Sequence, residues 1–225
     1  MFDGPRSPCT QTFGLGLFEM PTAADMDKLE AFFQDRGAPV FHETAPVAGK
    51  SLLPMLNQRG YRPIELSNVL FMEVSSRASV TAVRSESLQV RIAGKQDQEA
   101  WARTAAEGWR EFTEFADLML GLGRVTAARE DGVSFLVELD GQPIAAGGLA
   151  IHQGIALLAG ASTIPEFRRR GAQRLLLESR LQYAANAGCD LAMFCAEPGG
   201  GSQRNAERQG FRIAYTRTKF GLLTA

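Results

Sequence analysis

The stretch "FRRRGAQRLLLE", residues 167 to 178, places three arginines beside a glycine and continues directly into a leucine-rich helical pattern. A helix N-terminus carries unpaired backbone N–H groups and a partial positive charge, so it stabilises anions. Gly171 has no Cβ, which lets an anion approach the backbone closely, and Arg174 follows one turn later. Because an apolar strand pattern and a proline precede it, the stretch predicts a phosphate-binding turn between a strand and a helix.

The turn does not match the common nucleotide-binding motifs. The chain contains neither GxxxxGK[ST] nor a GxGxxG that follows a strand pattern. A basic helix start exposed to solvent explains the local charge equally well. The segments on either side of the turn therefore decide its interpretation.

The sequence from residue 86 onward predicts a mixed α/β sheet, with the order strand, helix, three strands, helix, strand, helix and closing strand or strands. A single helix is expected over residues 98–123. Its apolar stripe is formed by Trp101, Phe112, Phe115 and Met119. Asp140-Gly141 predicts a β-hairpin, and a further helix is expected over about 171–187.

The N-terminal part predicts a shorter α/β segment. A helix over 22–37 has Thr22 as its expected cap, and a strand, a second helix and a hairpin or pair of strands over 61–74 follow. Residues 75–87 are polar and serine-rich, which is typical of a linker.

The N-terminal part also resembles the second half of the chain. Gly37 aligns with Gly188, and Gly60-Tyr61 aligns with Gly210-Phe211, at offsets that differ by one residue. Both halves show helix, Gly, strand, helix, Gly-aromatic and strand in one register. This pattern predicts an internal repeat whose first copy lacks the arginine turn; chance similarity of two α/β segments is the alternative.

Two segments resemble a known family. "IPEFRRRGAQRLLLESRL", residues 164–181, resembles the acyl-CoA-binding segment of the GNAT N-acetyltransferase superfamily. The signature there is Gln or Arg, two variable residues, Gly, one variable residue, then Gly or Ala, and only Gln173 departs from it. "NAERQGFRIAY", residues 205–215, resembles the closing helix, Gly-Phe and final strand of that family.

The resemblance covers about residues 88–223 and implies the GNAT acyl-CoA N-acyltransferase fold. The expected domains are a degenerate GNAT-like N-terminal lobe over 1–75, a linker over 76–87 and a GNAT acetyltransferase domain over 88–225.

The resemblance also implies acetyl-CoA as co-substrate, with its pyrophosphate on backbone N–H groups of the arginine turn. The residues implied there are Arg168, Arg169, Arg170, Gly171, Ala172, Gln173 and Arg174. The pantetheine arm would lie along the preceding strand at Ala161, Ser162 and Thr163, whose main chain can polarise the thioester carbonyl. Ser202 and Asn205 could reach the CoA arm, with a helix N-cap as the alternative role for Ser202.

Transfer of an acyl group to an amine needs a base for the amine and an acid for the departing thiolate. The family often places a tyrosine four residues before the closing glycine, but Ala206 stands there. Tyr215 is the candidate acid, and Glu197 is the candidate base acting through water. The alternatives are a half-buried strand tyrosine and a loop carboxylate in solvent; His152 is a further candidate base for which simple exposure is the alternative.

The other chemistry-bearing residues give weaker indications. Glu107, Glu111 and Glu114 would suit a cationic amine acceptor, although a solvated helix face explains them as well. The three cysteines and two histidines lack metal-ligand spacing, so no metal is expected. Cys189 and Cys195 are interpreted as small core residues.

The bulk composition limits the partners. A formal net charge of -1 over 225 residues gives no general attraction to nucleic acid or to an anionic membrane. No apolar run of membrane-spanning length and no secretory signal pattern is present, so a cytoplasmic protein is expected. The closing strands could offer a sheet edge to a second copy of the chain, which would give a homodimer.

The predicted function is N-acetyl transfer from acetyl-CoA to a primary amine of a small molecule or protein, directly within a ternary complex. The first alternative is a non-catalytic module that binds acyl-CoA as a sensor or scaffold. The second is a structural pairing of two lobes in which the arginines only solvate a surface.

Overall fold

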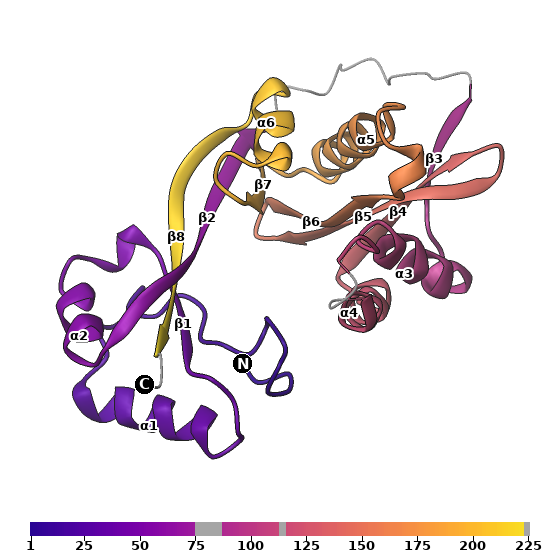
Figure 1. Cartoon of the computed structure of the whole chain (residues 1–225). Helices are drawn as coiled ribbons and strands as arrows, with labels where there is room; N and C mark the ends of the chain where they lie inside the picture. The colour runs from indigo at the N-terminus through magenta and orange to yellow at the C-terminus, as the bar shows by residue number, and fades with distance from the viewer. Residues whose placement is uncertain (75–86, 113–115, 223–225) are drawn as a thin grey trace. The chain divides into compact units, whose positions relative to one another are not determined.

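The computed structural model describes residues 1–74, 87–112 and 116–222 (Figure 1). Two compact units emerge, and each is described by itself. The first contains Met1–Leu70 together with the chain from Cys195 onward, and the second contains Phe71–Phe194. The unit boundaries cross β2 and β7, so these two strands contribute residues to both units.

The fold is mixed α/β, as expected. The described α-helices are α1 (Ala23–Gln34), α2 (Leu52–Gln58), α3 (Gln98–Glu107), α4 (Ala116–Ala127), α5 (Ala172–Asn186) and α6 (Gly201–Arg208). The described strands are β1 (Phe41–Thr44), β2 (Tyr61–Glu73), β3 (Leu88–Ile92), β4 (Gly132–Leu139), β5 (Gln142–His152), β6 (Ile155–Thr163), β7 (Leu191–Ala196) and β8 (Arg212–Leu222). Short 3-10 helices are η1 (Pro46–Ala48), η3 (Lys95–Asp97) and η5 (Pro165–Phe167).

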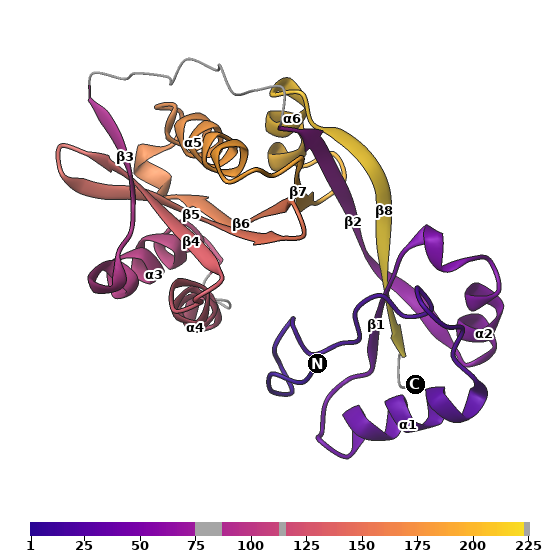
Figure 2. The same cartoon turned by 180° about the vertical axis from the view of Figure 1, so that it is seen from behind.

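The first unit contains a sheet in the order β1-β8-β2 with α1 and α2 packed on it (Figure 2). β1 and β8 are antiparallel, so His42 lies opposite Phe220 and Glu43 lies opposite Lys219. The predicted cap of α1 is confirmed, because Thr22 forms a capping box with Asp25. The core of this unit contains Met26, Phe33, Leu52, Leu56, Tyr61 and Phe220.

The second unit continues from the end of β2 in the order β2-β7-β6-β5-β4-β3. Its helices lie on both faces of the sheet (Figure 1). A Cβ on Gly147 would meet Leu176 of α5, whereas one on the next residue, Gly148, would approach Trp101 of α3. Since successive strand residues point to opposite faces, α5 and α3 cover opposite sides. Trp101 is buried, and its indole Nε1 donates to the Phe135 carbonyl at 3.0 Å.

The single helix expected over 98–123 is wrong, because α3 ends at Glu107 and α4 begins at Ala116. In a continuous helix the Gly108 carbonyl would accept from the amide of residue 112. Instead it accepts from Arg168 at 3.1 Å, and the Phe112 amide donates to Trp109 at 2.9 Å. Phe112 is therefore exposed and outside the apolar stripe, and Phe115 and Glu114 lie outside the described residues.

The hairpin or strand pair expected over 61–74 is also wrong, because β2 is one strand. Ser67-Asn68 could read as a turn, but Asn68 is buried within the strand. Its side chain donates to Gln203 at 3.0 Å and accepts from Thr216 at 2.6 Å. The hairpin at Asp140-Gly141 is confirmed, with both residues at positive φ. Most of the predicted linker, residues 75–86, lies outside the described residues.

The two aligned halves contain the same elements in the same order. α1, β1, α2 and β2 correspond to α5, β7, α6 and β8. Gly37, Gly60, Gly188 and Gly210, which align in pairs, all have positive φ. A shared origin of the halves and a linear domain boundary at 75–88 stay predictions. The compact units themselves are not linear in sequence, since β8 belongs with residues 1–70.

Candidate functional site

The arginine turn lies between β6 and α5 in the second unit, as the sequence predicted. η5 follows β6, residues 168–171 form the turn, and Gly171 is the N-cap residue of α5. Two residues of the turn adopt left-handed backbone, Arg169 at φ 64° and Gly171 at φ 88°. A non-glycine residue in this conformation costs about 1–2 kcal/mol, so packing around the turn must hold Arg169 there.

The main chain of the turn presents a row of free donors. Among the described residues, no acceptor pairs with the amides of residues 169–174, and the first amide bonded within this end of the helix is Leu175, to Gly171 at 3.0 Å. A Cβ built on Gly171 would meet nothing within 4 Å, so the space beside this glycine is open. The arrangement suits an anion with several acceptor oxygens.

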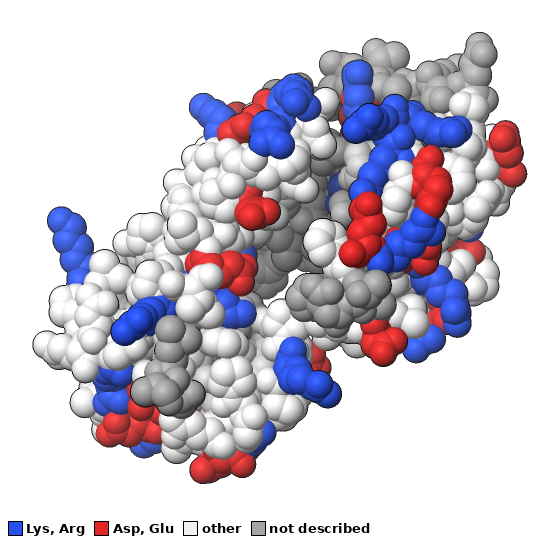
Figure 3. Space-filling model, viewed as in Figure 1, with Lys and Arg blue, Asp and Glu red and all other residues white. Residues whose placement is uncertain are grey.

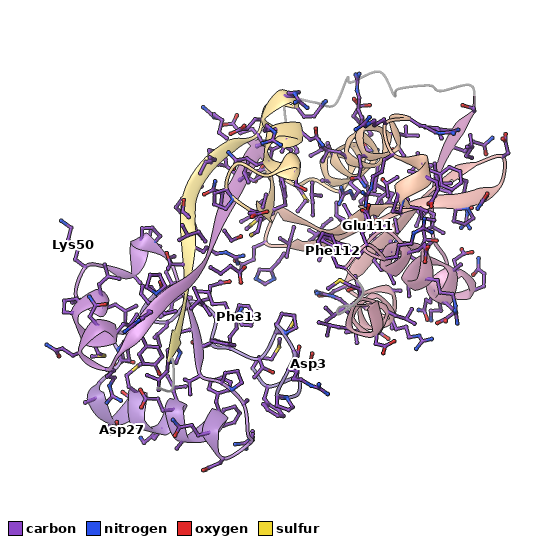
Figure 4. All side chains as sticks on the ribbon, viewed as in Figure 1. Asp3, Phe13, Asp27, Lys50, Glu111 and Phe112 are labelled. Carbon is purple, nitrogen blue, oxygen red and sulfur yellow. The ribbon has the colours of Figure 1, made fainter. Side chains whose placement is uncertain are left out.

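Side-chain contacts hold the turn against the rest of the unit. The Arg168 guanidinium donates to the Gly108 carbonyl at 3.1 Å, to the Thr163 carbonyl at 3.4 Å and to the Glu111 carboxylate at 2.5 Å. Gln173, the residue that departs from the family signature, donates to the Thr163 hydroxyl at 2.7 Å. Arg168 and Gln173 therefore tie the turn to β6 and to the segment after α3, where Figure 4 labels Glu111.

The remaining arginine side chains of this segment lie at the surface. Arg170 lies 5.7 Å from the centre of the Phe167 ring, and Arg174 donates to Glu178 at 2.8 Å. Arg169 is exposed and has no side-chain partner among the described residues. Basic and acidic side chains are interleaved on this unit in Figure 3, so the turn is a local rather than a general region of positive charge.

β6 carries a bulge and separates from β7, which sequence reasoning missed. Ala146 pairs with Ser162 and Gly148 pairs with Ala159, so two β6 residues lie opposite one residue of β5. Gly160, one of the two, has φ 61°. β6 pairs with its parallel neighbour β7 only over Ile155–Leu157, so its later main chain is free on that side within the described residues. A glycine inside the strand pattern "IALLAGAST" was the available signal.

The three β6 residues predicted to follow the pantetheine arm lie at this separated end. Ser162 and Thr163 are buried, and Ala161 is half-buried. The Ser162 hydroxyl donates to the Ala105 carbonyl at 2.8 Å, and the Thr163 hydroxyl accepts from Gln173. Their side chains thus fix β6 against α3 and the arginine turn.

The other predicted functional residues belong to the first unit. Glu197 is exposed after β7, and Tyr215 is half-buried in β8. Ser202 and Asn205 are exposed on α6, whose N-cap residue is Gly200, so the alternative of Ser202 as N-cap is wrong. Ala206 stands where the resemblance implies a tyrosine. It is 2 % exposed, and as an alanine it supplies no hydroxyl at this position.

The weaker candidates have ordinary surroundings. Glu107 pairs with Arg110 and Glu111 pairs with Arg168, so these carboxylates are already neutralised by arginines. Burial raises the pKa of the Cys189 and Cys195 thiols, which disfavours a nucleophilic thiolate.

Two further features are absent from the described residues. No group of three or more His, Cys, Asp or Glu could hold a metal ion there. Nor does any helix in these ranges combine the length and the hydropathy needed to cross a membrane.

The mixed α/β fold and the glycine-arginine turn between β6 and α5 are those that the resemblance implied. The family description "Acetyltransferase (GNAT) family" matches residues 96–211, which is more than half of the chain. The protein belongs to this family and is an acyltransferase enzyme. No curated protein sequence matches the chain significantly.

Solved structures share the fold over most of the chain. A GCN5-related N-acetyltransferase from Kribbella flavida has a TM-score of 0.70 at 20% identity, covering 90% of this chain and 75% of that chain. One from Sphaerobacter thermophilus has a TM-score of 0.64 at 17% identity, covering 90% and 68%. A tandem GNAT protein from the clavulanic acid biosynthesis pathway has a TM-score of 0.64 at 12% identity, covering 90% and 70%.

Proposed function

We propose that the protein is an N-acetyltransferase that moves an acetyl group from acetyl-CoA to a primary amine of a small molecule or protein. The observation that carries the proposal is the row of unpaired amides at residues 169–174 in front of open space at Gly171. Oxygens of a diphosphate would accept hydrogen bonds from these amides. The partial positive charge of the α5 N-terminus would stabilise each anionic group by about 0.3–1 kcal/mol.

The free edge of β6 supports the same ligand. The pantetheine arm of acetyl-CoA contains amide groups, and these could pair with β6 main chain near Ala161 in the way that an added strand does. Acetyl-CoA would supply the acetyl group as a thioester. In this proposal Arg168 and Gln173 position the turn, while its backbone N–H groups hold the phosphates.

The proposal also assigns residues to the two proton transfers that acetylation of the amine requires. Glu197 would take a proton from the amine through water, and Tyr215 would give one to the departing thiolate. Ser202 and Asn205, both exposed on α6, would add polar contacts to the CoA arm. Direct transfer in a ternary complex is expected because burial raises the pKa of the Cys189 and Cys195 thiols, which disfavours an acyl-enzyme on either of them.

A thermal-shift measurement with acetyl-CoA, followed by free-thiol release with a panel of amines, tests the proposal. A ligand at 100 times its Kd stabilises the fold by roughly 2.7 kcal/mol, which a melting experiment resolves. Acetyl-CoA stabilisation together with amine-dependent thiol release is the expected result. Stabilisation without release over any amine would instead favour a sensor, and no stabilisation at all would refute acyl-CoA binding.

A further inference from the structure

The first unit contains a cavity that the acyl-transfer proposal does not use. Its volume is about 200 Å³, and it is lined by β1, β2, β8 and the N-terminal segment. At ~30 Å³ per water molecule the space holds roughly seven waters, which is the size of a small metabolite. None of its lining residues belongs to the arginine turn.

The cavity lies on the sheet face opposite α1 and α2. Phe220 packs in the core with these helices, and the alternation of side chains along β8 turns Arg217 and Lys219 to the other face. The N-terminal segment covers this face by pairing with the edge of β1: the Thr12 amide donates to Phe41 at 3.0 Å. Phe13, labelled in Figure 4, lines the cavity and is 52% exposed.

Charges of both signs line the cavity, and only one pair of them is satisfied. Arg217 pairs with Glu43 at 3.0 Å. Lys219 and Glu65 form no ion pair with any described residue. The Lys219 ammonium lies 3.5 Å from the Pro8 carbonyl and 4.8 Å from the Phe41 ring, and its charge acts on Glu43, across the β1–β8 pairing, from beyond ion-pair distance. One cation and one anion are thus left for a ligand.

Unpaired hydrogen-bonding groups accompany these charges. Arg217 Nε, a donor, and Gln11 Oε1, an acceptor, are buried side-chain atoms without a hydrogen-bond partner in the described structure. Gln11 is 6% exposed and lines the cavity, so its free carbonyl oxygen is costly unless a ligand or water pairs with it. Burial and the neighbouring Glu65 raise the pKa of the Glu43 carboxyl, whereas Arg217 and Lys219 lower it.

We propose that this cavity binds a small zwitterion that carries one ammonium and one carboxylate, as a free α-amino acid does. The carboxylate would meet Lys219 and the Arg217 guanidinium, and the ammonium would meet Glu65 and the Gln11 carbonyl. A dianion would leave Glu65 without a counter-charge, and a dication would leave Lys219 without one. Phe13 gives the cavity an apolar wall, against which an amino acid side chain would pack.

The test is isothermal titration calorimetry on the full chain with the twenty standard L-amino acids. The best binder is then compared with the amine left when its carboxylate is removed and with the acid left when its ammonium is removed. Each analogue is expected to bind at least tenfold more weakly than the amino acid. An analogue that binds as tightly as the amino acid, or no amino acid with a Kd below about 10 mM, would overturn the proposal.

Two variants assign the groups. Lys219→Gln should weaken binding of the amino acid at least fivefold but leave binding of the amine analogue unchanged. Glu65→Gln should also weaken binding of the amino acid at least fivefold, but it should leave binding of the acid analogue unchanged. Arg62→Gln, an exposed change on β2 outside the lining of the cavity, is the matched control and should bind as the wild type does. Equal affinities in all three variants would refute the site.

The inference does not rest on acyl transfer, and the two are separable in the same samples. The thermal shift caused by acetyl-CoA should be the same in Lys219→Gln and Glu65→Gln as in the wild type. Loss of amino acid binding with an intact acetyl-CoA shift supports the cavity alone, whereas the absence of any acetyl-CoA shift counts only against the acyl-CoA proposal.

Discussion

Gly171→Glu is expected to abolish acetyl-CoA binding while the protein stays folded. The new Cβ meets nothing within 4 Å, so no clash disturbs the turn. A side chain at φ 88° costs about 1–2 kcal/mol of the free energy of unfolding. A carboxylate at a helix N-terminus returns about 0.3–1 kcal/mol, so the net loss of stability should be about 1 kcal/mol.

The loss of ligand affinity should be larger than the loss of stability. Two charges ~5 Å apart repel by about 0.8 kcal/mol in water and about 3 kcal/mol at an effective dielectric constant of 20. A diphosphate carries two such charges, so the carboxylate should cost about 2–6 kcal/mol of binding. At 1.4 kcal/mol per factor of ten, the Kd should rise by at least about thirtyfold.

Calorimetric titration of acetyl-CoA into three variants separates charge from backbone strain. Gly171→Ala tests the left-handed backbone alone, and Gly171→Gln adds the bulk without the charge. The Ala variant should bind within a few-fold of the wild type, the Gln variant more weakly, and the Glu variant most weakly. Wild-type affinity in a folded Glu variant would refute the placement of the diphosphate at this turn.

Four further changes test other parts of the structure. Arg168→Met removes the ties between the turn and residues after α3 and should weaken acetyl-CoA binding about tenfold in a titration, whereas Arg169→Met should weaken it less. Trp101→Ala should lower the free energy of unfolding by about 3–5 kcal/mol in urea denaturation, because the buried indole and its hydrogen bond are lost. Burial lowers the pKa of His42 from 6.5 to about 4. The contribution of His42 to the free energy of unfolding is therefore complete above pH 6.5 and is lost as the pH falls towards 4. The loss should be about 3 kcal/mol and should be absent in His42→Gln. Glu197→Gln should lower kcat at least tenfold, and an unchanged kcat would exclude Glu197 as the base.

Local chemistry made part of this fold predictable. The Asp140-Gly141 hairpin and the cap at Thr22 depend on a few neighbouring residues, and both are present. The position of the arginine turn was predictable for the same reason, since Gly171 directly precedes α5 and the basic residues directly precede Gly171. The contacts that decide these features lie within a few positions along the chain.

Features decided by distant residues were not predictable. The helical pattern over 98–123 is continuous, yet Arg168, far along the chain, takes the Gly108 carbonyl and helps to end α3. The bulge at Gly160 and the separation of β6 from β7 depend on pairing with two other strands. Periodicity reports which face of an element is apolar, but it contains no information on which strand becomes its neighbour.

The strand order β1-β8-β2 has a consequence for synthesis on the ribosome. β1 and β2 emerge early, but β8, which lies between them, is translated after all the other described strands. Until then both present open sheet edges, which are sites of aggregation. Removal of β8 would thus destabilise the first unit most, because β1 and β2 would lose the strand between them. A nascent-chain chaperone would have the longest interval in which to act on residues 41–73.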